Sequence, residues 1–203
     1  MALHDTAASL WRARVEDVLI TGELRYRIPK SNARVAKTRA QGRIFKGFAG
    51  KAASTQDFLE SLARATREIC HASAAGVSVL ERPLHGAPMF RWGAVCGVLA
   101  HHAGETFPNW SPSGATLERK SPQLFLYPAR CFNYLNQLTP AIIESLVVPI
   151  FVAERPWGTL WAVSHEEHRN FDCTDVDALS SLAELAADTL RRLPAAANLV
   201  PGI

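Results

Sequence analysis

The fold of this chain is decided by the segment Leu146-Val147-Val148-Pro149-Ile150-Phe151-Val152-Ala153-Glu154-Arg155-Pro156-Trp157-Gly158-Thr159-Leu160-Trp161-Ala162-Val163. An almost unbroken apolar run ends in a polar turn, and an alternating segment follows the turn. Two such segments around a short polar turn predict a β-hairpin. Beyond it, Phe171, Asp175 and Leu179 recur at spacings of four and open a long amphipathic helix, which we expect to cover the hairpin.

Similar patterns precede the hairpin. Ser54 begins a predicted helix that extends to Ala72, with an apolar stripe at helical spacing: Phe58, Leu62, Ala65, Ile69 and Ala72. Strands are predicted over 75–81, 90–99 and 123–127, and a short helix within 128–138, whereas 100–122 reads as a loop rich in Gly, Pro, Ser and His. The order predicts an α+β fold of about five to six antiparallel strands flanked by N- and C-terminal helices, at 54–72 and 174–192.

The two hairpin tryptophans carry a further expectation. Strict alternation places Trp157, Thr159, Trp161 and Val163 on one face of the sheet, and Trp157 and Trp161 then mark the face that the two terminal helices cover. Helix pairs from two protomers could form a four-helix bundle, so we expect a homodimer through the terminal helices.

Charge divides the chain at about residue 52. Residues 1–51 hold 11 Lys and Arg against 4 acids, and residues 52–203 hold 11 against 15, so the balances of +7 and −4 give the net +3. We expect residues 1–53 to be a basic, partly helical leader with one helix within 7–20, residues 54–193 to form the domain, and residues 194–203 to be a frayed tail. The aromatic residues of the leader are not interleaved with its basic ones, so we expect no nucleic-acid partner.

The cysteines and apolar runs indicate the compartment. Cys70, Cys96, Cys131 and Cys173 form no close pairs, which in a chain of this size favours reduced thiols and a cytoplasmic protein. The longest apolar runs are far shorter than the roughly 20 residues that span a bilayer, so we expect no membrane partner.

Three stretches together resemble the GAF domain, a small-molecule sensor module of bacterial signalling proteins. They are Ala74–Glu81, Ser111–Arg119, and Val148–Val163 followed by His165, Glu166, Phe171 and Asp175. The likeness spans residues 54–192 and is greatest to the subgroup found at the front of bacterial sensor kinases. It implies a non-catalytic sensory domain that binds a small molecule or a partner protein, such as a histidine kinase.

The resemblance also implies a pocket on one sheet face, beneath the long excursion between the inner strands. The candidate ligand-binding residues are Arg91, Trp92, Cys96, Trp110, Ser111, Ser113, Gly114, Arg119, Cys131, Phe132 and Tyr134. Ser113 and Gly114 could present backbone donors to an anionic or carbonyl group, with Arg119 adding charge. The alternative is a plain turn, with Arg119 in solvent or in a salt bridge.

Other site chemistries are less well matched by the residues. Bilin-binding GAF domains follow their attachment cysteine with histidine, whereas Phe132 follows Cys131, so we expect neither bilin nor haem. Adjacent His101 and His102 point opposite ways in extended chain, and His165 with His168 lacks a third ligand, so we expect no metal.

Two alternatives to a ligand-binding sensor remain open. One is a thiol enzyme like free methionine-R-sulfoxide reductase, in which Cys96 and Cys131 would meet across the cavity, although the flanking sequence of that enzyme is missing. The other is a dimerisation module with a pocket that is empty or is filled by its own side chains, notably Trp110 or Phe132.

Overall fold

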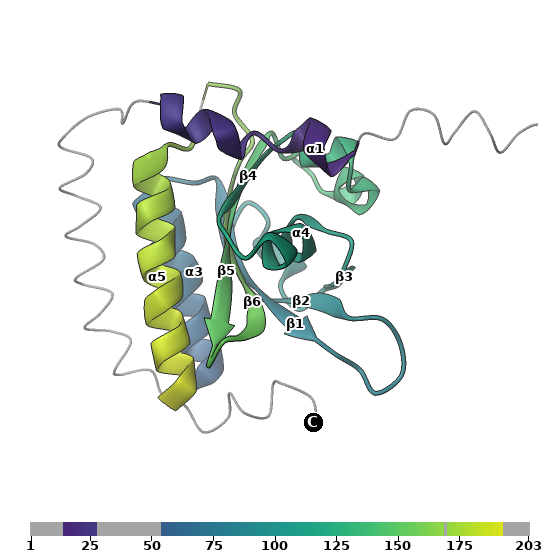
Figure 1. Ribbon diagram of the computed structural model, residues 1–203, viewed down its shortest axis with the longest axis vertical. Helices are drawn as coiled ribbons and strands as arrows, with labels where there is room; N and C mark the ends of the chain where they lie inside the picture. The colour runs from purple at the N-terminus through teal and green to yellow at the C-terminus, as the bar shows by residue number, and fades with distance from the viewer. Residues whose placement is uncertain (1–13, 28–53, 169, 193–203) are drawn as a thin grey trace, which may run out of the picture.

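The computed structural model describes residues 14–27, 54–168 and 170–192. Its centre is one six-stranded antiparallel sheet with the strand order β3-β2-β1-β6-β5-β4. The strands are β1 (Ala74–Glu81), β2 (Met89–Gly97), β3 (Thr106–Pro108), β4 (Gln123–Leu126), β5 (Glu144–Val152) and β6 (Arg155–Ser164). Helices α3 (Thr55–Cys70) and α5 (Cys173–Arg192) lie side by side on one face, and α4 (Pro112–Arg119) lies on the other (Figure 1). The predicted α+β fold with terminal helices is confirmed.

Helix α3 begins and ends where its sequence signals lie. The Ser54 side chain accepts a hydrogen bond from the Asp57 N–H at 3.1 Å, and its hydroxyl donates to the Asp57 carboxylate at 2.8 Å. His71 ends the helix in the left-handed conformation, with φ of 49°. The predicted stripe is buried against the sheet, with Phe58, Leu62 and Ile69 each no more than 2 % exposed.

Helix α5 has a reciprocal cap made by two aspartates. The Asp172 carboxylate accepts hydrogen bonds from the N–H groups of Thr174, at 2.9 Å, and Asp175, at 3.2 Å. In return, the Asp175 carboxylate accepts one from the Asp172 N–H at 3.1 Å. This is a capping box with Asp in the place of Glu, and it holds the first turn of the helix next to the sheet.

The hairpin contains a bulge that the alternation does not reveal. Ile150 pairs with Gly158 but Phe151 pairs with Pro156, so Trp157 is an extra residue in β6. Trp157 therefore packs among the helix-side residues, whereas Trp161 packs on the opposite face. The prediction that both tryptophans face the helices was wrong. The extra residue of the bulge interrupts the alternation of β6, so Trp157 and Trp161 lie on opposite faces.

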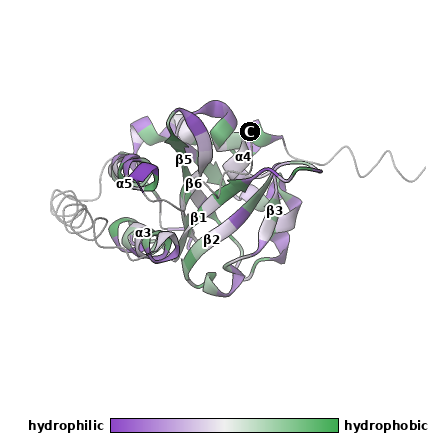
Figure 2. Ribbon diagram, turned by 90° about the horizontal axis from the view of Figure 1, so that it is seen from below, coloured by the Kyte–Doolittle hydropathy of each residue, from purple (hydrophilic) through white to green (hydrophobic). Residues whose placement is uncertain are grey.

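Hydrophobic residues form two cores, one on each face of the sheet. The helix-side core packs α3 and α5 against the sheet, and the excursion-side core packs residues 98–143 against the other face. Figure 2 shows the two helices side by side, each with a hydrophobic and a hydrophilic side. Residues 98–143 are called the excursion below. Within it, residues 100–122 were predicted to be a loop, but they hold β3 and α4. The Ser111-Pro112 pair supplies an N-cap and a first-turn proline for α4.

Residues 14–27 of the leader are packed against the domain. Val15 and Val18 of α1 (Val15–Val18) belong to the excursion-side core. Leu19 forms a β-bridge with Phe125, and the Ile20 N–H donates to the Leu124 carbonyl at 2.9 Å, which covers the β4 edge of the sheet. The remainder of the predicted leader helix, the basic residues 28–53 and the tail 194–203 lie outside the described residues.

Arg27 joins the leader to both the sheet and α5. It follows the 3₁₀-helix η2 (Thr21–Tyr26), and its guanidinium donates to the Glu144 carboxylate at 2.6 Å and to the Phe171 carbonyl at 2.8 Å. The Phe171 N–H donates to the other Glu144 oxygen at 2.6 Å. The Glu144 side chain is 1 % exposed and that of Arg27 is 17 % exposed, so this ion pair is shielded from water.

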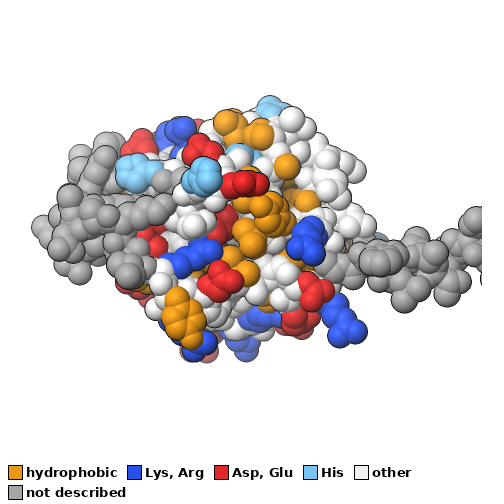
Figure 3. Space-filling view, turned by 90° about the horizontal axis from the view of Figure 1, so that it is seen from above, with side chains coloured by type: hydrophobic (Ala, Val, Ile, Leu, Met, Phe, Trp, Pro, Cys, Tyr) orange, Lys and Arg blue, Asp and Glu red, His pale blue; other side chains and the backbone are white. Residues whose placement is uncertain are grey.

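The surface that carries the leader has no field of a single charge. Figure 3 shows acidic and basic side chains intermixed on this face, with hydrophobic groups between them. None of the described helices is both long enough and apolar enough to cross a membrane.

We predict that Arg27→Ala lowers the free energy of unfolding by about 3 kcal/mol, because it leaves the Glu144 carboxylate buried without its cation. Urea denaturation followed by circular dichroism measures the change. The matched control is Arg64→Ala: its partner is Glu60 at 3.8 Å and both side chains are exposed, so we expect a loss of less than about 1 kcal/mol. Equal losses for the two variants would contradict a buried role for Arg27.

Candidate functional site

A small cavity lies between the excursion and the sheet face opposite α3 and α5. Its volume is about 30 Å³, which is room for about two water molecules. Three aromatic rings line it, from Trp92, Tyr134 and Trp161, together with the hydroxyl residues Ser113 and Ser145. The other lining residues are apolar: Pro112, Pro128, Leu135, Ile142, Val147 and Val163. None of the eleven carries a charge.

The indole of Trp161 forms the floor of the cavity and depends on a glycine. A Cβ atom on Gly76 would overlap the Trp161 ring and would lie 2.6 Å from the Ala94 carbonyl oxygen. Only glycine therefore lets the ring lie flat over β1. The ring N–H of Trp161 donates to the Ser78 hydroxyl at 3.0 Å, which fixes the orientation of the indole.

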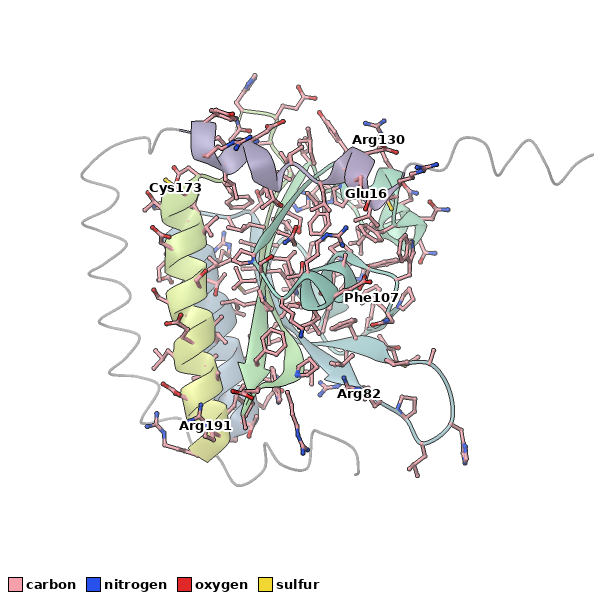
Figure 4. The ribbon with its side chains drawn as sticks, in the orientation of Figure 1. Glu16, Arg82, Phe107, Arg130, Cys173 and Arg191 are labelled. Carbon is pink, nitrogen blue, oxygen red and sulfur yellow. The ribbon has the colours of Figure 1, made fainter. Side chains whose placement is uncertain are left out.

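A row of aromatic rings continues from the floor toward the roof. The Trp92 ring lies 4.7 Å from the Trp161 ring and 4.4 Å from that of Phe107, between centroids. Phe107 in turn lies 5.1 Å from Tyr134, and Figure 4 labels Phe107 beside α4. These contacts bury the Tyr134 phenol. Burial raises its pKa above the ordinary value, against a smaller lowering by a hydrogen bond with Ser111.

Helix α4 forms part of the roof and is pinned to the sheet by a hydroxyl pair. The Ser113 and Thr159 hydroxyls lie 2.8 Å apart, and both side chains are buried. The Ser111 side chain caps the helix by accepting from the Gly114 N–H at 3.1 Å. A Cβ on Gly114 would overlap the Asn109 carbonyl, so the first turn requires a glycine there.

One hydroxyl of the cavity wall lacks a partner. Ser145 on β5 is 4 % exposed and lines the cavity. Within the described residues, its hydroxyl forms no hydrogen bond. Because it faces the cavity, this hydroxyl can hydrogen-bond to water or to whatever else occupies the cavity.

Three predicted site residues line the cavity: Trp92, Ser113 and Tyr134. Five others support it from nearby. Cys131 and Phe132 are buried in the excursion-side core, and the half-exposed Trp110 packs its ring 5.6 Å from that of Phe132. Ser111 and Gly114 shape the first turn of α4.

Arg91, Cys96 and Arg119 do not line the cavity. Arg91 pairs with Glu81 at 2.6 Å, and Arg119 pairs with Glu16 of the leader at 3.1 Å, which is the salt-bridge alternative. The Cys96 thiol donates to the Ala63 carbonyl of α3 at 3.1 Å, on the helix side. A bulge separates Cys96 from Trp92: Val77 pairs with Ala94 but Ser78 pairs with Trp92, which leaves Gly93 unpaired and reverses the alternation.

The sequence reasoning missed the lining residues of the hairpin strands, which include Ser145, Val147, Trp161 and Val163. Their alternation in β5 and β6 was visible. This alternation would have identified the lining residues if the face toward the excursion had been known. The bulge at Trp157 concealed which residues of β6 lie on that face.

The histidines form no metal site in the described part of the chain, where no three potential ligands cluster. The His102 ring pairs with Glu105 at 2.9 Å. The His165 ring contacts the Ala141 carbonyl at 2.8 Å, a local hydrogen bond at the end of β6.

A hollowed sheet face beneath an excursion, with two terminal helices on the reverse, defines the class of this α+β domain. The sequence profile of the GAF domain matches residues 52–191, more than half of the chain. The chain belongs to the GAF domain family.

Solved structures share this fold at low sequence identity. The GAF domain of an Acinetobacter phosphoenolpyruvate-protein phosphotransferase aligns with a TM-score of 0.64 and 14% identity, covering 78% of this chain and 93% of that one. Free methionine-R-sulfoxide reductase from Neisseria meningitidis, in complex with its substrate, aligns at 0.61 and 18%, covering 80% and 93%. The photosensory core module of Stigmatella aurantiaca phytochrome aligns at 0.63 and 12%, covering 79% and 37%. No curated protein sequence matches the chain.

We predict that Gly76→Ala destabilises the protein by about 1–3 kcal/mol, because the new methyl group displaces the Trp161 ring and its hydrogen bond with Ser78. The near-ultraviolet circular dichroism of the tryptophans should change with it. Gly22→Ala is the control, because a Cβ there meets no atom within 4 Å. A Gly76→Ala protein with an unchanged tryptophan spectrum would contradict the packing.

We predict that Tyr134 makes the fold sensitive to alkali. Because burial raises its pKa above the ordinary 10.0, the folded state keeps a proton that the unfolded state releases, and stability falls as the pH rises above about 10. Urea denaturation at pH 8 to 11 should show a smaller fall for Tyr134→Phe. Tyr26→Phe, on an exposed ring, is the control and should follow the parent protein.

Proposed function

We propose that the chain is a non-catalytic regulatory GAF module that binds a small molecule in this cavity as part of bacterial signal transduction in the cytoplasm. The observation that carries the proposal is a cavity walled by aromatic rings and hydroxyls, in which the Ser145 hydroxyl faces the cavity and has no hydrogen-bond partner among the described residues. Ligand sites are typically lined in this way, by mostly apolar residues with a few polar groups.

The cysteines argue against the thiol-enzyme alternative. Thiol–disulfide chemistry needs an attacking thiolate and a second thiol within reach. Cys96 lies in the helix-side core and Cys131 in the excursion-side core, so the sheet separates them. Burial also raises the Cys96 pKa, which lowers the fraction of reactive thiolate. Cys173, at the N-terminal end of α5, lies far from the excursion (Figure 4).

The small volume of the cavity favours a ligand-induced opening. The lining residues Pro128 and Leu135 belong to the short 3₁₀-helices η4 (Pro128–Arg130) and η5 (Asn133–Gln137), whose hydrogen bonding is weaker than that of an α-helix. These turns can shift more readily than the strands of the floor. In the dimerisation alternative, the cavity stays empty and these turns do not shift.

The sheet offers a route from the cavity to a partner. β5 lines the cavity through Ser145 and Val147 and packs against α5 on its other face. A ligand that shifts β5 would therefore bias the position of α5. We propose that α3 and α5 pair with a second copy of the chain, and that a histidine kinase or another signalling protein receives the change.

Native mass spectrometry of the full chain purified from cells tests ligand binding. We expect a bound small molecule that is lost on denaturation. Val147→Ile adds one methylene group toward the cavity and should abolish the bound mass. Val148→Ile adds the same group on the helix side and should keep it.

Two outcomes would contradict the proposal. One is the absence of any bound mass together with no ligand-induced change in thermal stability. The other is consumption of free methionine sulfoxide in the presence of a reductant, abolished by Cys96→Ser or Cys131→Ser.

A further inference from the structure

We propose that the cavity selects an uncharged molecule no larger than a single ring, which hydrogen-bonds to the Ser145 hydroxyl and packs its apolar part against Trp92, Trp161 and Tyr134. This inference rests on the proposed function and names the chemical class of its ligand. Three observations carry it: a hydroxyl without a partner, a wall without charge, and a limited volume.

The Ser145 hydroxyl supplies the polar contact. Ser145 is 4 % exposed and lines the cavity, and its hydroxyl forms no hydrogen bond among the described residues. The other serine of the wall, Ser113, is already paired with Thr159 at 2.8 Å. A serine hydroxyl both donates and accepts, so an alcohol, a phenol or an amide would satisfy it equally well.

The uncharged wall selects against anions. No lining residue is charged; Arg91, Arg119 and Arg27 are paired with Glu81, Glu16 and Glu144, and Arg130 of η4 is exposed to solvent. A carboxylate or phosphate in this cavity would be removed from water without a counter-charge, which is strongly unfavourable. The same argument disfavours ammonium groups, because no lining residue is acidic.

The small volume favours a small ligand, because each further ring would require a larger outward movement of the roof. About 30 Å³ holds roughly two water molecules, so even a single ring requires the roof to move outward. The floor cannot yield in the same way, because Trp161 lies directly over Gly76 and the Ala94 backbone. We therefore expect no fused-ring or linear tetrapyrrole ligand at this site.

The test compares four probes with the full chain: isopropanol and phenol, which are neutral and carry a hydroxyl, toluene, which has no polar group, and benzoate, which is an anion. Binding is measured by the shift of backbone amide resonances of Ser145 and Val147 during titration. We expect phenol to bind about tenfold more tightly than toluene, the usual worth of one hydrogen bond, and benzoate not to bind. Isopropanol should bind more weakly than phenol because it buries less apolar surface.

Variants assign the hydrogen bond. Ser145→Ala should weaken phenol about tenfold and leave toluene unchanged. Ser164→Ala is the matched control, a buried serine on the neighbouring strand that does not line the cavity, and it should leave both probes unchanged. Circular dichroism of each variant verifies that it is folded.

The inference is overturned if benzoate binds as well as phenol, if toluene matches phenol, if Ser145→Ala leaves phenol unchanged, or if neither hydroxylated probe binds. In the last case the cavity holds water only or takes another class of ligand. A bound mass that Val147→Ile removes would then still support the proposed function, so the two failures are distinguishable.

Discussion

The contact between the Trp161 indole and the bare backbone of Gly76 is the constraint on which the site depends. The ring can lie over β1 only because Gly76 has no side chain, and its N–H is held by Ser78 on the same strand. Trp161 then positions Trp92, and Trp92 positions Phe107 and Tyr134 through successive ring contacts. One glycine thus determines how close the aromatic wall lies to the sheet, and so how much space is left beneath the excursion. The bulge at Trp157 is part of the same arrangement, because it turns Trp161 toward the cavity while Trp157 fills the helix side.

The leader connects the two sides of the sheet. Val15 and Val18 pack in the excursion-side core, whereas Arg27 reaches Glu144 and the backbone of Phe171, immediately before the capping box of α5. Glu144 is also the neighbour in sequence of Ser145, whose side chain points to the opposite face. A movement of β5 that alters Ser145 would therefore strain the buried ion pair with Arg27. In a low-dielectric site such a pair tolerates little displacement, because each partner is costly to leave unpaired.

Much of the fold follows from periodicity, and the site follows from it only in part. The stripes that begin at Phe58 and Phe171 predict α3 and α5, and the hairpin turn predicts β5 and β6, because long regular elements average over many residues. Bulges cannot be seen in this way: a single extra residue at Gly93 or Trp157 reverses a face while it leaves the local composition unchanged. The wrong placement of Cys96 and Trp161 has this one cause. Helix α4 was predicted to be a loop because Ser, Pro and Gly are typical of turns. In α4 these residues have helical roles: Ser111 is the N-cap, Pro112 lies in the first turn, and Gly114 allows a close approach to Asn109.

The Ser145 hydroxyl, which faces the cavity without a hydrogen-bond partner among the described residues, is the feature that favours the proposed ligand binding over packing alone. In a module whose function is pairing alone, an apolar residue such as valine at this position would fill more of the space and need no hydrogen-bond partner. Val147, two residues further along the same face, shows that β5 accommodates a larger apolar side chain beside the cavity. The hydroxyl is therefore a hydrogen-bonding group in the cavity that packing does not require, and water or a bound molecule can pair with it. Because the neighbouring wall is aromatic and uncharged, an uncharged molecule would be the best match for a hydrogen bond with Ser145.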